Sequence, residues 1–470
     1  MIQPVILWTD ALIFLLVFLV IVFAIYASRY EHLRAPWREV IRSRMAVASL
    51  VILSVYTLVG LLDSLHFRKA LPQQDGQQEE QYDGDVLSVL DEMLGVMRTQ
   101  EEKTYSAPFA THLYTKEFIV SADGERVRTF PRLKYGGASL DDPATEAWPD
   151  IRSRLIVALL QTAGVALLLY LVLGWVLARR WRRSTGQVLA DLGRGRTDIP
   201  WRTAFLTLGC VIFLVALIAN MSAHWHMMGT DKVGQDVLYQ SIKSIRTGLV
   251  IGTLTTLVML PFAVFLGMMA GYFRGWVDDV IQYLYTTLNS IPGVLLIAAA
   301  VLMMQVYMAI HPELFETMAE RADMRLLFLC IILGITSWTG LCRLLRGETL
   351  KLRELDYVEA ASAFGVSRLK IMVRHLLPNL MHLVMIAVVL DFSGLVLAEA
   401  VLSYVGVGVD PTTMSWGNMI NRARLEMARE PFVWWSLLAA FGFMFTLVLA
   451  ANLFSDAVRD AFDPRLRAQR

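Results

Sequence analysis

Long apolar runs dominate the chain, and short polar or charged stretches separate each run from the next. A helical run of roughly 18 or more apolar residues is long enough to cross a bilayer core of about 30 Å. Nine such runs occur, at about 5–26, 46–64, 155–178, 204–222, 247–270, 284–309, 325–342, 380–405 and 432–454. The pattern predicts an all-α polytopic membrane protein with about nine transmembrane helices.

The polar segments divide the chain into modules. Residues 1–64 hold two transmembrane helices, and 65–154 form a long hydrophilic segment with more acidic than basic residues. Residues 155–203 hold the third transmembrane helix and a basic linker, and 204–470 hold six closely spaced spans. We therefore expect a six-helix core preceded by three extra N-terminal helices.

The hydrophilic segment carries its own secondary-structure signals. In "GDVLSVLDEMLGVMRTQ" apolar residues recur at spacings of three and four, which predicts a helix. In "KEFIVSADGERVRTF" Asp123–Gly124 stands between two β-favouring runs, which predicts a hairpin. Residues 65–154 are therefore expected to form a small α+β domain outside the membrane.

Basic residues predict the orientation of the chain, because short loops rich in Lys and Arg stay in the cytoplasm. The loop after the first span contains five arginines, Arg29, Arg34, Arg38, Arg42 and Arg44. The linker that starts at Arg179 is also basic. Both should be cytoplasmic, with the N-terminus and segment 65–154 outside (periplasmic) and the C-terminus cytoplasmic. The first run has no basic stretch before it, so we interpret it as a retained span rather than a cleaved signal.

Composition supports the membrane assignment and limits the chemistry. The chain is 56% hydrophobic with a formal net charge of +1, and no nucleic-acid partner is expected. Its three cysteines lie in or beside apolar spans, so no disulfide framework is expected. The sequence contains no G-x-x-x-x-G-K-[ST], H-E-x-x-H or G-x-S-x-G motif. His224 and His226 form too small a ligand set to predict a metal site, and we favour polar residues at a span end. No catalytic residue, metal or directly bound cofactor is expected.

The stretch "EAASAFGVSRLKIMVRHLLPN" is amphipathic and interrupts the apolar pattern. Gly365 suits the left-handed position that ends a helix. Ser367 is a good N-cap for a second helix, with Val366 and Ile371 spaced as a hydrophobic staple, and Pro378 should end the unit before the next span. The pattern predicts two short helices joined by a tight turn. A connector that merely lies on the membrane surface fits the pattern equally well.

This stretch resembles the EAA loop of ABC importer permeases, in which E-A-A is followed by G and later by L-P. "MGTDKVGQDVL" is similar to a segment of the dipeptide/oligopeptide/nickel permease subfamily, with Gln235 in place of the usual arginine. "RGWVDD", "SIPGVLL", "LAEAVLSYVGVGV", "PTTMSWGNMI" and "RDAFDPRLR" resemble further blocks of that subfamily, in order. The resemblance covers nearly all of 204–467 and is to the C-type permease of the pair.

The resemblance implies a function. The chain would be a transmembrane permease subunit of an ATP-driven importer for peptides or related small solutes in a bacterial inner membrane. Its expected partners are a second homologous permease, two ATP-binding subunits that use the ATP, an external substrate-binding protein and the lipid bilayer. The EAA loop at 347–379 would dock the ATPases through Glu359, Ala360, Ala361, Gly365, His375 and Pro378.

Other polar residues have candidate roles. Asp391 and Glu399 lie within one span and, because carboxylates are costly there, should line a hydrated translocation path or form structural hydrogen bonds. By resemblance, the external gate and binding-protein docking site would include Asp231, Asp236, Trp416 and Asn418, although Trp416 also suits an interfacial anchor.

Two rival functions follow from the same residues. An intramembrane enzyme could use Asp391 and Glu399 as an acid–base pair, and it would act without ATP or partner chains. A receptor could sense a ligand through 65–154, but it would need a cytoplasmic signalling domain, for which the C-terminal tail is too short.

Overall fold

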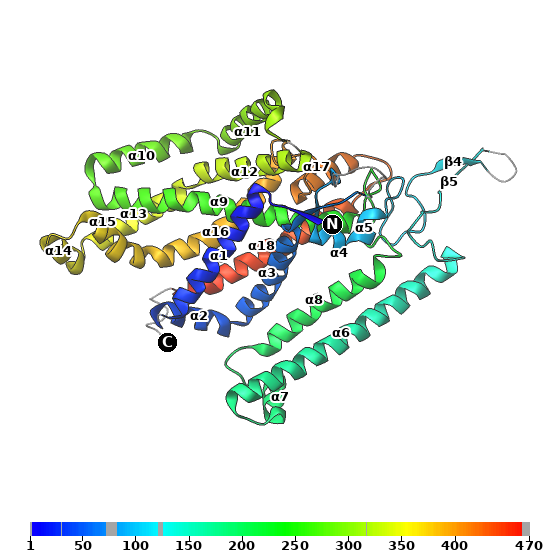
Figure 1. Ribbon diagram of the computed structural model, residues 1–470, viewed down its shortest axis with the longest axis horizontal. Helices are drawn as coiled ribbons and strands as arrows, with labels where there is room; N and C mark the ends of the chain where they lie inside the picture. The colour runs from blue at the N-terminus through cyan, green and yellow to red at the C-terminus, as the bar shows by residue number, and fades with distance from the viewer. Residues whose placement is uncertain (1, 30, 72–81, 121–125, 316, 463–470) are drawn as a thin grey trace, which may run out of the picture.

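The computed structural model describes residues 2–29, 31–71, 82–120, 126–315 and 317–462. Long helices run side by side between two ends of the molecule (Figure 1). We call the end that carries β4 and β5 the hairpin end and the end that carries α14 the coupling end. Within these residues, nine helical segments are long and apolar enough to cross a membrane, and each contains most of one predicted run. The predicted all-α polytopic fold is confirmed.

Three helices form the N-terminal part. α1 (Trp8–Ser28) and α3 (Arg44–Asp63) are the first two spans, and α2 (Glu31–Arg42) is a short amphipathic helix between them. α3 packs against α8, α9 and α18 of the following modules. The first two of the extra spans, α1 and α3, are therefore part of the main helical body.

The hairpin end combines short strands and helices. β1 (Ile2–Val5), β2 (His66–Lys69) and β3 (Leu87–Ser88) form an antiparallel sheet next to α4 (Val89–Met93) and α5 (Gly95–Thr99). The predicted helix is thus present as two short pieces. The predicted hairpin is β4 (Glu117–Val120) paired with β5 (Arg126–Thr129), and its proposed turn at Asp123–Gly124 lies outside the described residues.

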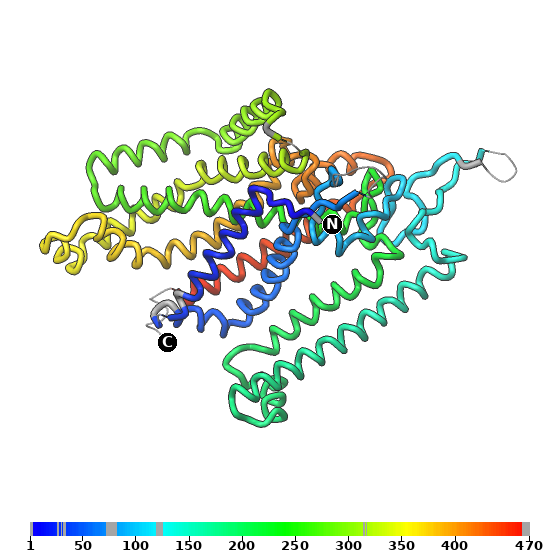
Figure 2. Tube along the Cα trace, viewed as in Figure 1, coloured from blue at the N-terminus to red at the C-terminus, as the bar shows by residue number. Residues whose placement is uncertain are grey.

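A helical pair stands beside the main body. α6 (Pro143–Trp181) and α8 (Trp201–Met221) pack along one another and are joined through α7 (Thr185–Arg194), as Figure 2 shows. α6 begins twelve residues before the expected boundary at 155, because Asp142 caps it and Pro143 suits its first position. At 1.5 Å per residue its 39 residues exceed the bilayer core, so the helix continues into the hydrophilic segment.

The remaining helices surround α9 (Val237–Phe273). They are α10 (Gly275–Ser290), α11 (Gly293–Ile310), η1 (Pro312–Leu314), α12 (Met318–Ser337), α13 (Thr339–Arg353), α16 (Leu377–Tyr404), α17 (Trp416–Glu426) and α18 (Trp435–Phe462). Gly267 and Gly271 let α9 approach α13 closely, because a Cβ at Gly267 would lie 2.8 Å from the Cys342 carbonyl oxygen. Small residues four apart commonly allow such helix contacts in membranes.

The predicted span at 284–309 is wrong in its first part. α10 ends at Ser290, Ile291 is extended and α11 starts after Pro292. The residue before a proline is disfavoured in the helical conformation, so the apolar run breaks into two helices. Length and apolarity alone could not reveal this break.

Candidate functional site

The candidate site lies at the coupling end, where the chain turns between α13 and α16. α14 (Asp356–Ala363) and α15 (Arg368–Ile371) form the predicted pair of short helices, which projects beyond the long spans (Figure 1). A π-helical turn, η2 (Met372–Leu376), joins α15 to α16. We call residues 356–376 the coupling loop.

Gly365 makes the turn between the two helices. Its φ of +73° is the left-handed conformation predicted for this position. The N–H of Gly365 donates to the Ser362 carbonyl and the N–H of Val366 donates to the Ala361 carbonyl, which completes the helix C-terminus. Apart from the adjoining residues, no described atom lies within 4 Å of the position that a Cβ would take at Gly365, so a larger residue would strain the backbone rather than collide with a neighbour.

One expectation about the second helix is confirmed in position only, and another is wrong. Ser367 stands at the N-cap as predicted, but its side chain makes no capping hydrogen bond. Pro378 does not end the unit, because α15, η2 and α16 follow without interruption and Pro378 lies in the first turn of α16. The widened turn accommodates a proline that has no N–H to donate. The second helix is therefore a direct extension of a membrane span.

The coupling loop buries little of its own surface. Val358 of α14 is buried, and Ile371, Met372 and Leu376 of the second helix pack with it on the core. Several large apolar side chains of the loop are instead exposed, namely Tyr357, Phe364, Leu369 and Val373. Phe364 is 87% exposed at the tip. Apolar side chains exposed together on a projecting element are typical of a protein-binding surface.

The predicted docking residues occupy this projecting element. Glu359 and Ala360 are exposed and Ala361 is half-buried. His375 is half-buried, with its ring 6.2 Å from the Tyr357 ring. His375 therefore packs within the loop, whereas Glu359 and Ala360 are accessible to a partner.

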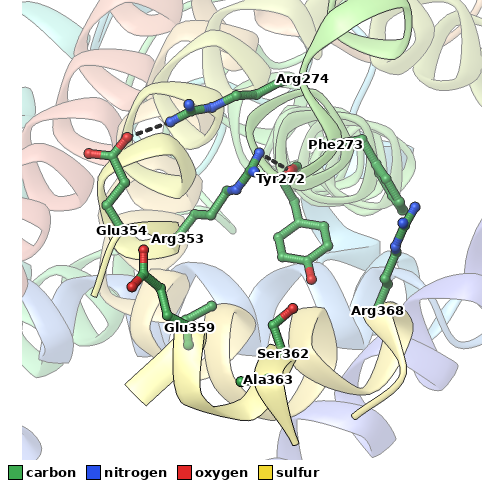
Figure 3. Close-up of a pocket in the computed structure, with 10 residues that line it drawn as sticks. Tyr272, Phe273, Arg274, Arg353, Glu354, Glu359, Ser362, Ala363 and Arg368 are labelled. Atoms are coloured by element: carbon green, nitrogen blue, oxygen red, sulfur yellow. Dashed lines mark hydrogen bonds and ion pairs between the residues drawn. The ribbon is translucent and has the colours of Figure 1, made fainter. Parts of the chain in front are cut away.

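A cavity of about 580 Å³ lies between the coupling loop and the ends of α9 and α13 (Figure 3). Its lining consists of Tyr272, Phe273, Arg274, Arg353, Glu354, Val358, Glu359, Ser362, Ala363 and Arg368. Arg274 pairs with Glu354 at 2.5 Å, and Arg353 Nη1 donates to the Tyr272 carbonyl at 2.7 Å. The Glu359 side chain makes no hydrogen bond or ion pair with a described residue. The Glu359 carboxylate can therefore pair with a basic side chain of another protein, whereas the Glu354 carboxylate in the same cavity is already paired with Arg274.

An ion pair behind the cavity fixes α13. Arg346 donates two parallel hydrogen bonds to Asp278 of α10, at 2.5 and 2.7 Å. Bidentate arginine–carboxylate pairs define orientation as well as contributing energy. Analysis of the sequence did not assign this pair, although "RGWVDD" and "RLLRGE" each supply one member.

A second polar cluster lies at the hairpin end. His226 is buried, with Nδ1 2.8 Å from Asp236 and Nε2 3.5 Å from Glu102. The longer distance is too great for a good hydrogen bond, so Glu102 acts mainly through its charge. Burial alone would lower the pKa of His226, but the two carboxylates outweigh burial and raise the pKa to about 9. His226 is therefore a charged structural residue and not the interfacial polar residue that we expected.

Glu102 joins segment 65–154 to the core. Its carboxylate accepts the backbone N–H groups of Lys134, Tyr135 and Gly136 at 2.7–3.2 Å. Burial alone would raise the pKa of Glu102, but the neighbouring histidine and these N–H groups lower the pKa to about 2. The backbone of Glu102 touches Gly234, where a Cβ would lie 1.8 Å from the Glu102 carbonyl oxygen. This contact explains the second glycine of "GTDKVG".

The four residues predicted for the external gate are mostly internal. Asp236 caps α9 and is buried, and Asp231 is half-buried, where it accepts N–H groups of its own loop. Trp416 is buried and donates to the Ser241 carbonyl. Asn418 is also buried and donates to two carbonyls of the loop before α17. In this conformation these side chains position the loops and do not present themselves to a docked protein, so their role at the gate remains a prediction.

Asp391 and Glu399 have different surroundings on α16. Glu399 is 2% exposed, accepts the Ser403 hydroxyl at 2.7 Å and closely faces Gly417 of α17. This arrangement favours the alternative of a structural hydrogen bond. Asp391 is half-buried, and its side chain makes no hydrogen bond or ion pair with a described residue. Its place on the translocation path remains a prediction.

Buried ion pairs tie the N-terminal helices to the core. Lys243 of α9 contacts Asp63 at 2.6 Å and Asp91 at 2.9 Å. One turn further on, Arg246 contacts Asp10 of α1 at 2.6 Å. Charged residues at the edges of apolar runs are the signal that could have predicted these pairs.

Known proteins are similar to the second half of the chain. Residues 263–468 match the family described as binding-protein-dependent transport system inner membrane component. A glutathione transport system permease protein of Pectobacterium atrosepticum is 32% identical over 247 residues, which are 53% of this chain and 74% of that protein. An oligopeptide transport system permease protein of Mycobacterium tuberculosis is 29% identical over 245 residues (52% and 78%). A dipeptide transport system permease protein of Lactococcus lactis is 30% identical over 240 residues (51% and 64%).

Proposed function

The chain belongs to the family of binding-protein-dependent transport system inner membrane components, and from that premise we propose that it couples ATP hydrolysis by separate subunits to solute import. It is a multi-pass permease subunit of an ABC importer. The substrates are peptides or related small solutes, in keeping with the names of its relatives.

The observation that carries this function is the exposed coupling loop. α14 buries a single side chain, Val358, while Phe364 and Glu359 face outward beside a cavity. The second helix of the loop runs directly into α16. A push on the loop by an ATPase would therefore move a membrane span as a rigid lever.

The chemistry of the loop indicates what an ATPase must offer. Phe364 requires an apolar groove, and the Glu359 carboxylate, which pairs with no described residue, requires a basic side chain. The coupling end then faces the cytoplasm and the hairpin end faces outward, as the arginines of the loop after the first span predict. Two ATP-binding subunits and a second homologous permease complete the proposed complex.

A binding protein would dock at the opposite end. The β4–β5 hairpin projects from the body (Figure 1), and Phe118 is 72% exposed on it. The predicted gate residues make hydrogen bonds that support loops of the chain. This arrangement favours the hairpin as the first contact with an external protein.

The rival functions find little support. Glu399 is buried against α17 and accepts the Ser403 hydroxyl, which favours a structural role over acid–base chemistry with Asp391. The similar proteins are transport permeases. Neither observation favours a membrane enzyme or a receptor.

Charge reversal at Glu359 tests the proposal. Glu359→Lys should weaken ATPase association at least about tenfold, because like charges would meet across the interface. Glu313→Lys is the matched control, since Glu313 is exposed but lies in η1, away from the coupling loop. The chain would be purified from native membranes and its partners quantified by mass spectrometry. Equal ATPase recovery with both variants, or recovery of no ATPase with the unmodified chain, would contradict the proposal.

A further inference from the structure

α2 has a position that the import function does not explain. It connects the spans α1 and α3 at the coupling end, and the ring of its Trp37 lies 5.6 Å from the Phe462 ring at the end of α18. A helix between the ends of spans lies at the level of lipid headgroups. Tryptophan is enriched at this level of a bilayer.

Three arginines share one face of α2. Arg34, Arg38 and Arg42 are spaced four residues apart, and all are exposed. Arg34 and Arg38 make no ion pair with a described residue. Arg42 lies 3.8 Å from Glu39, and both side chains are about half exposed, so this pair is weak. The arginines therefore retain most of their capacity to bind an anion.

The other side of α2 is anchored to protein. Val40 is buried in a cluster with Val458 and Ala461 of α18, and Trp37 packs against the same cluster. This packing holds the helix in place without using its arginines. The three exposed arginines are therefore held on a helix that is fixed in place by its packing against α18.

The arginines line a cavity of about 530 Å³ rather than a flat surface. Trp37 and Ile41 contribute apolar walls from α2, and Asp198 and Ile199 close the cavity from the linker before α8. Three arginines and one aspartate give the lining a formal excess of two positive charges. Guanidinium groups match phosphate geometry, and the apolar walls suit the glycerol and the start of an acyl chain.

We propose that the cavity between α2 and residues 198–199 binds the phosphate of an anionic phospholipid headgroup. The ligand chemistry is a phosphate diester, and the placement of the cavity where spans end favours a lipid over a free phosphate. Amphipathic helices with arginine on one face and Trp or Ile on another commonly bind anionic membrane surfaces. The inference depends on the membrane placement of the chain and not on ATPase docking.

The test uses the whole chain in nanodiscs of phosphatidylcholine that contain a minority of phosphatidylglycerol, with bound lipids counted by native mass spectrometry. The triple variant R34Q/R38Q/R42Q should bind phosphatidylglycerol about 100-fold more weakly, since each juxtamembrane arginine contributes about fivefold. The control R180Q/R183Q/R194Q removes the same charge from exposed arginines of the α6–α7 region and should retain the lipid. Millimolar inorganic phosphate should not displace the lipid.

Unchanged lipid binding in R34Q/R38Q/R42Q would overturn the proposal, and three further results would each identify another explanation or separate the proposal from the import function. Equal lipid loss in both triple variants would indicate general surface attraction. Displacement by inorganic phosphate would identify free phosphate as the ligand. Unchanged lipid binding together with loss of ATPases from R34Q/R38Q/R42Q would assign the face to an acidic protein surface. Loss of lipid with ATPases retained would support the lipid site irrespective of the import function.

Discussion

The buried cluster around Arg246 allows a quantitative test of how the N-terminal helices are held. Arg246 Nη2 lies 2.6 Å from Asp10 Oδ1, 2.9 Å from Thr9 Oγ1 and 3.6 Å from Asp323 Oδ1. The second oxygen of Asp10 lies 2.7 Å from His66 Nδ1. The Asp10 side chain is 0% exposed and that of Arg246 is 11% exposed, so water can do little to replace a lost partner.

Asp10→Asn removes one charge from this cluster and keeps the side-chain volume. Removing one member of a buried ion pair typically costs about 3–5 kcal/mol. Asp323 remains near Arg246 and compensates part of its charge, so we expect a loss of roughly 2–3 kcal/mol. Thermal unfolding in detergent, followed by tryptophan fluorescence, should show an apparent Tm lower by roughly 5 °C.

The matched control is an exposed pair. Glu92→Gln breaks the contact between Lys69 and Glu92, whose side chains are 47% and 59% exposed, and such pairs contribute about 0–1 kcal/mol. Its Tm should stay close to that of the unmodified chain. Equal Tm values for Asp10→Asn and Glu92→Gln would refute the idea that the Arg246 cluster anchors α1 to the core.

Two further predictions concern other ionisable groups. The raised pKa of His226 means that its charged form contributes roughly 3 kcal/mol to the free energy of unfolding, fully present below about pH 6.5 and lost as the pH rises through about 9. The Tm difference between the unmodified chain and His226→Gln should therefore shrink over that range. A constant Tm difference would contradict the assigned cluster. Asp391→Asn should change the Tm little, because the Asp391 side chain has no described partner. If this side chain lines the translocation path, the substitution should lower substrate uptake in cells. Unchanged uptake at equal expression would show that Asp391 does not line the path.

The sequence predicted spans and turns correctly where the signal lies within one continuous stretch of residues. Apolar length predicted the nine spans, and Gly365 predicted the turn of the coupling loop because glycine readily adopts a positive φ. The same length criterion placed residues 284–290 in a span, although Pro292 separates them from α11. Pro378 was predicted to end a unit, whereas a π-helical turn carries the helix through it.

Long-range pairing could not be predicted from local patterns. β1 has only four residues and contains a proline, and its pairing with β2 depends on two spans that return the chain to the same end. His226 was interpreted as an interfacial residue because no periodic pattern links it to Asp236, ten residues further on, or to Glu102, 124 residues earlier. Segment 65–154 was expected to form a small α+β domain outside the membrane, and local patterns do not reveal that its Asp91 and Glu102 are buried beside Lys243 and His226 of the following part of the chain.

The central claim is that the two ends of the chain receive different partners, and site-specific photo-cross-linking in native membranes tests it most directly. A photoreactive phenylalanine analogue would replace Phe364 at the coupling end or Phe118 at the hairpin end, both of which are highly exposed. The account predicts an ATP-binding subunit cross-linked from position 364 and an exported solute-binding protein from position 118. An ATP-binding subunit captured from position 118, or lipid alone captured from position 364, would contradict it.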